Sequence, residues 1–243
     1  MMVSTPIDVP VVRPAGERRM YTVAAIVAAI VVFAGFAPSY YLKGVFGTPE
    51  LSTLKHIHGV VMTAWFTLFF VQVRLIAKGN TALHRQVGAW GILLAIAVVI
   101  AGTALGIASA KAGVSPEPKI PPLVFLALPL GEMFTFAALF TAAILLRKRS
   151  PWHKRLMLVA SIAMLTPASA RLPFAFIQEG APLSLFAVAD LVILGCIAFD
   201  TVRNRRLHPA FAVGLAFVIV SQLGRLALTQ TAAWMSFAKW VAA

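Results

Sequence analysis

The five histidines are the side chains of this sequence best suited to bind a metal or a cofactor. They are His56, His58, His84, His153 and His208. All five fall at or near the ends of apolar runs, and none lies at the centre of one. Because an ionisable side chain is tolerated at a membrane boundary much better than in hydrocarbon, this placement alone does not identify a site. The residues next to each histidine therefore carry the argument.

Two of the histidines are followed by basic residues at the expected start of a helix. These segments are Leu83-His84-Arg85-Gln86-Val87 and Trp152-His153-Lys154-Arg155-Leu156. If both helices start on the same side of the membrane, His84 and His153 lie at equal depth and can face each other, as bis-His haem ligation requires. Arg85, Lys154 and Arg155 would then be placed to pair with the haem propionates. Phosphate headgroups select the same residue types at a membrane boundary, so both interpretations stay open.

A second group lies at the start of an earlier helix. His58, Met62 and Trp65 stand at positions i, i+4 and i+7, so they share one face of that helix. An imidazole next to a thioether suits Cu(I) or a haem iron. His56 lies about 200° around the helix from His58 and could join only if the first turn is frayed. The alternative is that the histidines are interfacial residues and that Met62 fills the core.

A few charged residues fall inside the apolar runs, where each one needs a physical reason. They are Glu132, Arg171, Asp190, Asp200 and Arg225. Glu132 and Asp190 with Arg171 and Arg225 could form internal ion pairs, which would be architectural. The same four residues could instead line a polar path for a proton or an anionic substrate. The sequence does not decide between these two readings.

Sequence motifs of soluble enzymes are absent. There is no Walker A loop, dinucleotide-binding glycine fingerprint, His-Glu-x-x-His or Cys-x-x-Cys pattern. Cys196 is the only cysteine, so an internal disulfide is excluded. Whether the chain is an enzyme is left open.

The composition predicts the elements that must position these residues. Hydrophobic residues make up 60% of the 243 residues and charged residues 12%, whereas a soluble domain carries about 25% charged residues. Apolar runs such as 22–37 and 91–110 approach or exceed the ~18 residues that cross a bilayer. We therefore expect an all-α integral membrane bundle of about seven transmembrane helices, with an N-terminal segment at 1–19 and a single domain at 20–243. The expected helices lie near 20–37, 52–77, 84–110, 122–147, 153–177, 182–202 and 209–239.

The distribution of positive charge predicts the topology. The net charge is +13, but the Lys and Arg residues lie between apolar runs instead of forming one patch. This pattern indicates membrane topology and contact with the lipid bilayer, and it disfavours nucleic acid as a partner. Basic residues concentrate before the first helix and in every second connection, so the positive-inside rule predicts a cytoplasmic N-terminus and an outer C-terminus.

The stretch from Leu54 to Gly88 carries a resemblance to known families. It contains His56-Ile57-His58-Gly59, Trp65-Phe66, Gln72 and Leu83-His84-Arg85-Gln86-Val87-Gly88. In these short motifs it resembles bacterial multi-pass membrane proteins of the DUF2306 and DUF420 groups, and more distantly b-type cytochrome membrane subunits. The cytochrome resemblance implies haem, with His84 and His153 as ligands. The DUF420 resemblance implies a role near haem-copper oxidase assembly.

The leading hypothesis is a bacterial inner-membrane helical bundle that binds haem or copper through helix-end histidines. Its role would be electron transfer or respiratory-complex assembly, which makes other membrane-complex subunits expected partners. One alternative is a transporter or channel-like protein that uses Glu132, Arg171, Asp190 and Arg225 as a polar path. An enzyme acting on a lipid and a scaffolding accessory subunit are further alternatives.

Overall fold

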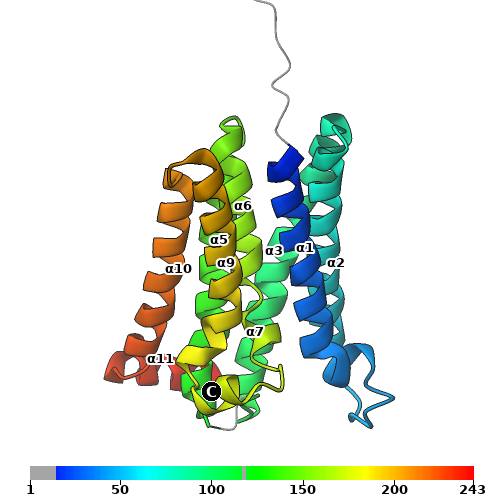
Figure 1. Ribbon diagram of the computed structural model, residues 1–243. Coiled ribbons are helices and arrows are strands. Elements are labelled where there is room, and N and C mark those ends of the chain that lie inside the picture. The colour runs from blue at the N-terminus through cyan, green and yellow to red at the C-terminus, as the bar shows by residue number, and fades with distance from the viewer. Residues whose placement is uncertain (1–14, 117–118) are drawn as a thin grey trace, which may run out of the picture.

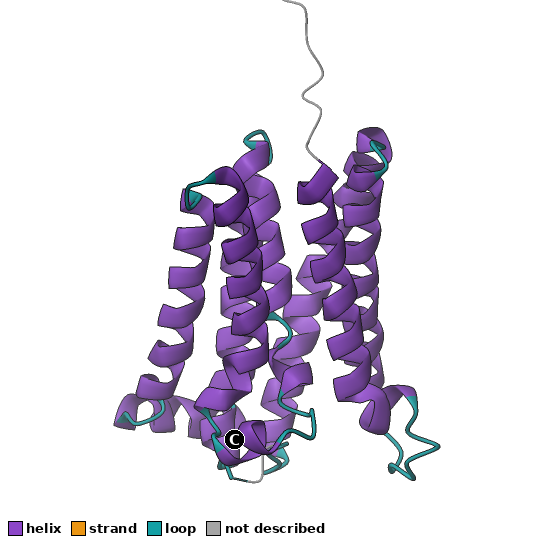
Figure 2. Ribbon diagram, viewed as in Figure 1, coloured by secondary structure: helices purple, strands orange, loops and turns teal. Residues whose placement is uncertain are grey.

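A computed structural model describes residues 15–116 and 119–243, and every regular element in those two ranges is helical. Figures 1 and 2 show a bundle of long helices running up and down, joined by short connections at its two ends. The expected all-α membrane bundle is therefore confirmed in its fold class.

Six segments of the described chain are long and apolar enough to cross a membrane. Four contain the long helices α1 (Ala15–Phe36), α2 (Thr53–Ala77), α3 (Thr81–Lys111) and α10 (Pro209–Leu228). In the first of them, a π-helical turn, η1 (Ala37–Tyr41), extends α1. The fifth joins α4 (Pro122–Phe125) to α5 (Ala127–Leu145), and the sixth joins the 3₁₀ turn η2 (Leu183–Phe186) to α9 (Ala187–Asn204). The chain is thus a multi-pass membrane protein.

The shorter helix α6 (Ser150–Ala163) is largely enclosed by the rest of the bundle. The side chains of Leu158, Val159 and Ile162 are fully buried. Gly214 of α10 faces α6, and a Cβ there would be in ordinary van der Waals contact with Val159, 3.4 Å away. Because other helices surround much of α6, this helix need not be as long as one that crosses the membrane mainly in contact with lipid.

The helix expected at 153–177 is wrong as a continuous element. α6 ends at Ala163, α7 (Thr166–Ser169) follows, and α8 (Ala175–Glu179) comes after an irregular stretch. Pro167 accounts for the first break, because a proline ring clashes with the carbonyl four residues before it, which is that of Ala163. The Thr166 hydroxyl donates instead to the Ala163 carbonyl at 3.1 Å. Breaks of this kind inside a membrane bundle are tolerated where protein groups satisfy the backbone.

The helix expected at 209–239 is also two helices. α10 ends at Leu228, and a second helix, α11 (Ala232–Ala242), follows. Thr231 caps the start of α11, because its side chain accepts a hydrogen bond from the Trp234 N–H. The Trp234 indole then donates to the Leu123 carbonyl at 3.0 Å and ties α11 to α4. α11 therefore lies at one end of the bundle and does not prolong α10 (Figure 1). The first helix also begins at Ala15, five residues before the expected start.

One end of the bundle carries most of the positive charge, and we call it the basic end. There α1 begins, and α2 joins α3, α5 joins α6, and α9 joins α10, as the upper end of Figure 1 shows. Its basic residues are Arg18, Arg19, Arg74, Lys78, Arg85, Arg147, Lys148, Arg149, Lys154, Arg155, Arg203, Arg205 and Arg206. We call the other end, with η1, α7, α8 and α11, the opposite end. The count of seven crossings and the cytoplasmic location of the basic end stay predictions.

Candidate functional site

The basic end brings together His84 and His153, which we call the histidine pair. Each is the fourth residue of its helix, α3 and α6 respectively. Their ring centroids lie 6.4 Å apart, and the ring planes meet at 78°. The structure therefore brings the two imidazoles together in an edge-to-face arrangement, each at the same position of its helix.

Local sequence explains why both helices begin where they do. Before α3, Gly79 adopts a left-handed φ of +78° and the Asn80 side chain accepts a hydrogen bond from the Leu83 N–H at 3.1 Å. In α6, Pro151 occupies the first turn, where a backbone N–H would have no partner within the helix, so the missing N–H of proline costs nothing. These two starts set the depth of His84 and of His153.

Protein groups contact the Nδ1 atom of each ring. The Nδ1 of His153 lies 2.8 Å from the Ala143 carbonyl oxygen on α5. Since a carbonyl only accepts, this nitrogen carries a proton, and in the neutral ring the lone pair is on Nε2 of His153. With its amide oriented so that the oxygen accepts from the Gly88 N–H at 2.9 Å, Gln72 places its nitrogen 2.5 Å from the Nδ1 of His84. Both rings are therefore oriented by neighbouring helices.

The three basic residues next to the histidine pair have different surroundings. Arg85 is exposed on the first turns of α3. Lys154 forms an ion pair with Glu17 of α1. Arg155 is buried and binds Asp200 of α9 through two nitrogens, with contacts of 2.7 Å and 3.1 Å. The guanidinium of Arg155, expected at a propionate, is thus already matched to a carboxylate.

Glu132 and Arg225, which we call the buried ion pair, join α5 to α10 in the half of the bundle near the opposite end. Their side chains are each 5% exposed, and Nη1 of Arg225 lies 2.8 Å from Oε2 of Glu132. Arg225 also donates to the Leu128 and Ser221 carbonyls, at 3.2 Å each. Its guanidinium lies 5.3 Å from the centre of the Phe186 ring. This charge is neutralised and surrounded by acceptors.

The other two charges of the predicted polar path, Asp190 and Arg171, differ in how close they lie to that pair. Asp190 accepts a hydrogen bond from the Gln222 side chain at 2.9 Å. Arg171 is exposed, donates to the Pro167 carbonyl and lies 4.7 Å from the centre of the Phe36 ring. Asp190 thus lies within range of the charges of Glu132 and Arg225, whereas Arg171 contacts other residues.

The two histidines predicted as copper ligands, His56 and His58, differ in how far they are exposed. His58 is half-buried, and its Nδ1 has no hydrogen-bond partner within the described chain. His56 is exposed; its carbonyl accepts from the Tyr40 hydroxyl at 3.4 Å, and its ring lies 6.0 Å from that of Tyr40. Over residues 15–116 and 119–243 there is no group of three His, Cys, Asp or Glu side chains suited to a metal ion. Copper at His58 and Met62 stays a prediction.

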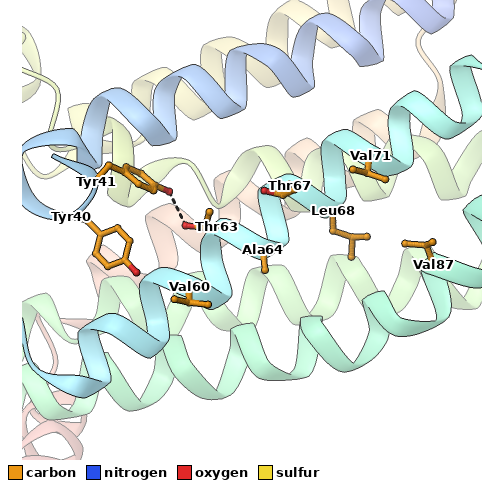
Figure 3. A pocket seen from close by; sticks show the side chains of 9 residues that line it. All are labelled: Tyr40, Tyr41, Val60, Thr63, Ala64, Thr67, Leu68, Val71 and Val87. Carbon is orange, nitrogen blue, oxygen red and sulfur yellow. Dashed lines mark hydrogen bonds between the residues drawn. The ribbon is translucent and has the colours of Figure 1, made fainter.

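A long apolar groove lies along the outward side of α2, between η1 and α3, with a volume of about 590 Å³ (Figure 3). Its lining residues are Tyr40, Tyr41, Val60, Thr63, Ala64, Thr67, Leu68, Val71 and Val87. The Tyr41 hydroxyl and the Thr63 hydroxyl lie 2.8 Å apart and close one end. Gly59 accommodates the Tyr40 ring, because a Cβ there would lie 2.4 Å from it. The groove faces the region that lipid chains occupy.

Sequence reasoning missed the role of Gln72 in this site. In the sequence this residue appears only among the short motifs of the Leu54 to Gly88 resemblance. Its contact with His84 depends on how α2 and α3 close at the turn around Gly79, and spacing alone does not give that geometry.

Comparisons with known proteins give no match: no family model, no curated protein and no solved structure resembles the chain. The resemblance to the DUF2306 and DUF420 groups stays a prediction, and function must be argued from the geometry.

Proposed function

We propose that this protein binds haem at the basic end, with His84 and His153 as the two axial ligands, and that it acts in electron transfer or respiratory-complex assembly in the bacterial inner membrane. The observation that carries the proposal is the 6.4 Å separation of the two imidazole centroids. The same proposal places the basic end in the cytoplasm.

The separation fits two imidazoles on opposite sides of one iron. An Fe–N bond is about 2 Å and the ring centre lies roughly 1 Å beyond the nitrogen, so axial ligands place their centroids about 6 Å apart. Imidazoles that share a tetrahedral metal would lie closer together. The distance between the rings thus supports axial ligation more than a compact metal site.

The contact between His153 and Ala143 supports the same function. A metal-ligating histidine commonly donates its other ring N–H to a carbonyl or carboxylate, which fixes the tautomer and the ring orientation. The 2.8 Å contact from Nδ1 of His153 to the Ala143 oxygen is of this kind and leaves Nε2 for the iron.

Of the basic residues, only Arg85 is kept in the proposal as a partner for a propionate, since it is exposed near His84. Arg155 is matched to Asp200. When bound, haem would supply a one-electron carrier at the membrane boundary, and Gln72 and the Ala143 carbonyl would orient the two imidazoles that hold it.

Copper at His58 and Met62 is the second candidate, because the unpartnered Nδ1 of His58 is a buried group for which a ligand would account. The transporter alternative has less support. Glu132 and Arg225 neutralise each other, and Asp190 accepts a hydrogen bond from Gln222. Each of these charged side chains therefore has a partner in the protein and needs no bound solute.

The test is a visible absorption spectrum, before and after dithionite reduction, with haem and metal analysis of the protein purified from cells supplied with haem. We expect one haem per chain in the wild type and none in the variant His84→Ala/His153→Ala. The matched control is His208→Ala, which removes another histidine of the basic end. Haem retained by the double variant would contradict the ligand assignment, and copper without haem would favour the second candidate.

A further inference from the structure

The two members of the histidine pair differ in what contacts their Nδ1 atoms. His153 faces a backbone carbonyl, which can only accept. His84 faces the side-chain amide of Gln72, which carries both a donor and an acceptor. A carbonyl fixes one tautomer of an imidazole, whereas an amide can support either one, depending on which of its ends is presented.

Two groups of fixed character assign the orientation of this amide: the Gly88 N–H only donates and the His84 carbonyl only accepts, so the amide oxygen belongs toward Gly88 and the nitrogen toward His84. That nitrogen lies 2.5 Å from Nδ1 and 3.2 Å from the carbonyl oxygen of His84, while the amide oxygen accepts from the Gly88 N–H at 2.9 Å. The amide thus bridges two successive turns of α3.

This orientation has a consequence for the proton of His84. An N–H donated to Nδ1 requires a lone pair on Nδ1, so the ring proton is on Nε2. Ligation through Nε2 requires the other tautomer, with the proton on Nδ1 and an acceptor facing it. The Gln72 amide can supply that acceptor by turning over, at the expense of its bond from Gly88.

We propose that Gln72 is a positioning residue that sets the tautomer of His84: it holds the Nε2–H form in the protein without a ligand, and it supports the Nδ1–H form by presenting its oxygen when His84 binds iron. The second half rests on the proposed function, whereas the first half does not. Binding of iron to His84 therefore requires the Gln72 amide to turn over, whereas His153 already has the tautomer that binds iron through Nε2.

The first half is tested on the protein without haem, by ¹⁵N NMR of labelled histidine side chains. We expect the Nε2–H tautomer for His84 in the wild type and the Nδ1–H tautomer in Gln72→Glu, because a carboxylate only accepts. Gln72→Met is the second variant, to be used if Gln72→Glu does not fold. It keeps the side-chain length but has no amide, so His84 should show a mixture of the two tautomers. Gln86→Glu, on an exposed position of α3, is the control. An Nδ1–H wild type, or a tautomer that Gln72→Glu leaves unchanged, would overturn the proposal.

The second half is tested by redox titration of the haem-loaded protein. We expect Gln72→Glu to keep one haem per chain and to lower the midpoint potential, since a more basic imidazole favours the oxidised iron. The potential should stay unchanged in Gln86→Glu. A wild type that binds no haem would defeat the proposed function while the NMR result stands, and equal potentials in wild type and Gln72→Glu would defeat only this inference.

Discussion

The histidine pair and the buried ion pair solve the problem of a polar group in a membrane protein in two ways. Glu132 and Arg225 are charged, 5% exposed and matched to each other, so either one without its partner is a cost to the fold. His84 and His153 are half-buried, and neighbouring helices contact the Nδ1 atom of each ring. Groups that can be removed cheaply but are carefully oriented point to function, whereas groups that complete each other point to architecture.

The largest expected effect is on the buried ion pair. Glu132→Ala leaves the Arg225 guanidinium buried without a counter-charge, and we expect a loss of about 3–5 kcal/mol in the free energy of unfolding. Reversible unfolding in mixed micelles, followed by circular dichroism, measures it. Glu50→Ala, in the exposed pair with Lys43, is the control and should show no measurable loss.

A double substitution sharpens that result. Glu132→Leu with Arg225→Leu removes both charges, so most of the lost stability should return. If the double variant is as unstable as Glu132→Ala, the pair has a role beyond charge compensation.

The next effect tests the backbone packing that supports the opposite end. A Cβ on Gly35 of α1 would lie 2.1 Å from the Ala168 carbonyl oxygen of α7. Gly35→Ala should therefore cost about 1–3 kcal/mol through overpacking, although alanine normally favours a helix. Gly195→Ala, a helical position with open space around it, should cost nothing in the same unfolding assay. Equal stabilities for the two variants would mean that α1 and α7 do not pack this closely.

A smaller loss is expected for the histidine pair itself. His84→Ala/His153→Ala removes two oriented rings but leaves no buried charge, so the free energy of unfolding without haem should fall by only about 1–2 kcal/mol. The same unfolding assay, run without haem, gives the value. A loss as large as that of Glu132→Ala would make the histidines structural and erase the contrast between the two regions.

The smallest effect concerns His208, outside the membrane-spanning segments. Burial first, and then the nearby Arg155, lower the pKa of His208 below its ordinary value of 6.5. Its Nδ1 accepts from the Ala210 N–H at 3.1 Å, which requires the neutral ring. The folded state thus binds fewer protons than the unfolded state, and stability falls as pH drops from 6.5 towards the folded pKa.

A pH series of the unfolding free energy measures this slope. His208→Asn keeps a good N-terminal cap without a titrating ring, so the part of the slope due to His208 should disappear. An unchanged slope in that variant would assign the pH dependence to other groups.

Much of the bundle could be predicted because it follows from apolar length and helix starts. The helix expected at 52–77 is found at Thr53–Ala77, and His84 and His153 meet because each stands at the same position of a helix that begins at the basic end. Contacts between distant helices were not predictable. Arg155 binds Asp200 and Gln72 contacts His84, and both pairings depend on helix rotation, which apolar patterning leaves undetermined.

The two broken helices end at local features of different visibility in the sequence. Pro167 cannot donate a hydrogen bond to the Ala163 carbonyl, and its ring clashes with that carbonyl, so α6 ends there. A proline inside an apolar run can be read directly from the sequence. The end of α10 is harder to read, because it depends on hydroxyls: Thr229 donates to Leu226 and Thr231 donates to Leu228, at 2.7 Å each.

The most direct test of the central claim is low-temperature electron paramagnetic resonance of the oxidised, haem-loaded protein. Two axial imidazoles whose planes meet at 78° should give a low-spin signal of the strongly anisotropic type that near-perpendicular ligand planes produce. His153→Ala should convert it to a high-spin signal or lose the haem, while His208→Ala should leave it unchanged. A high-spin wild-type signal, or a low-spin signal that survives the loss of both His84 and His153, would contradict the assignment of the histidine pair as the haem ligands.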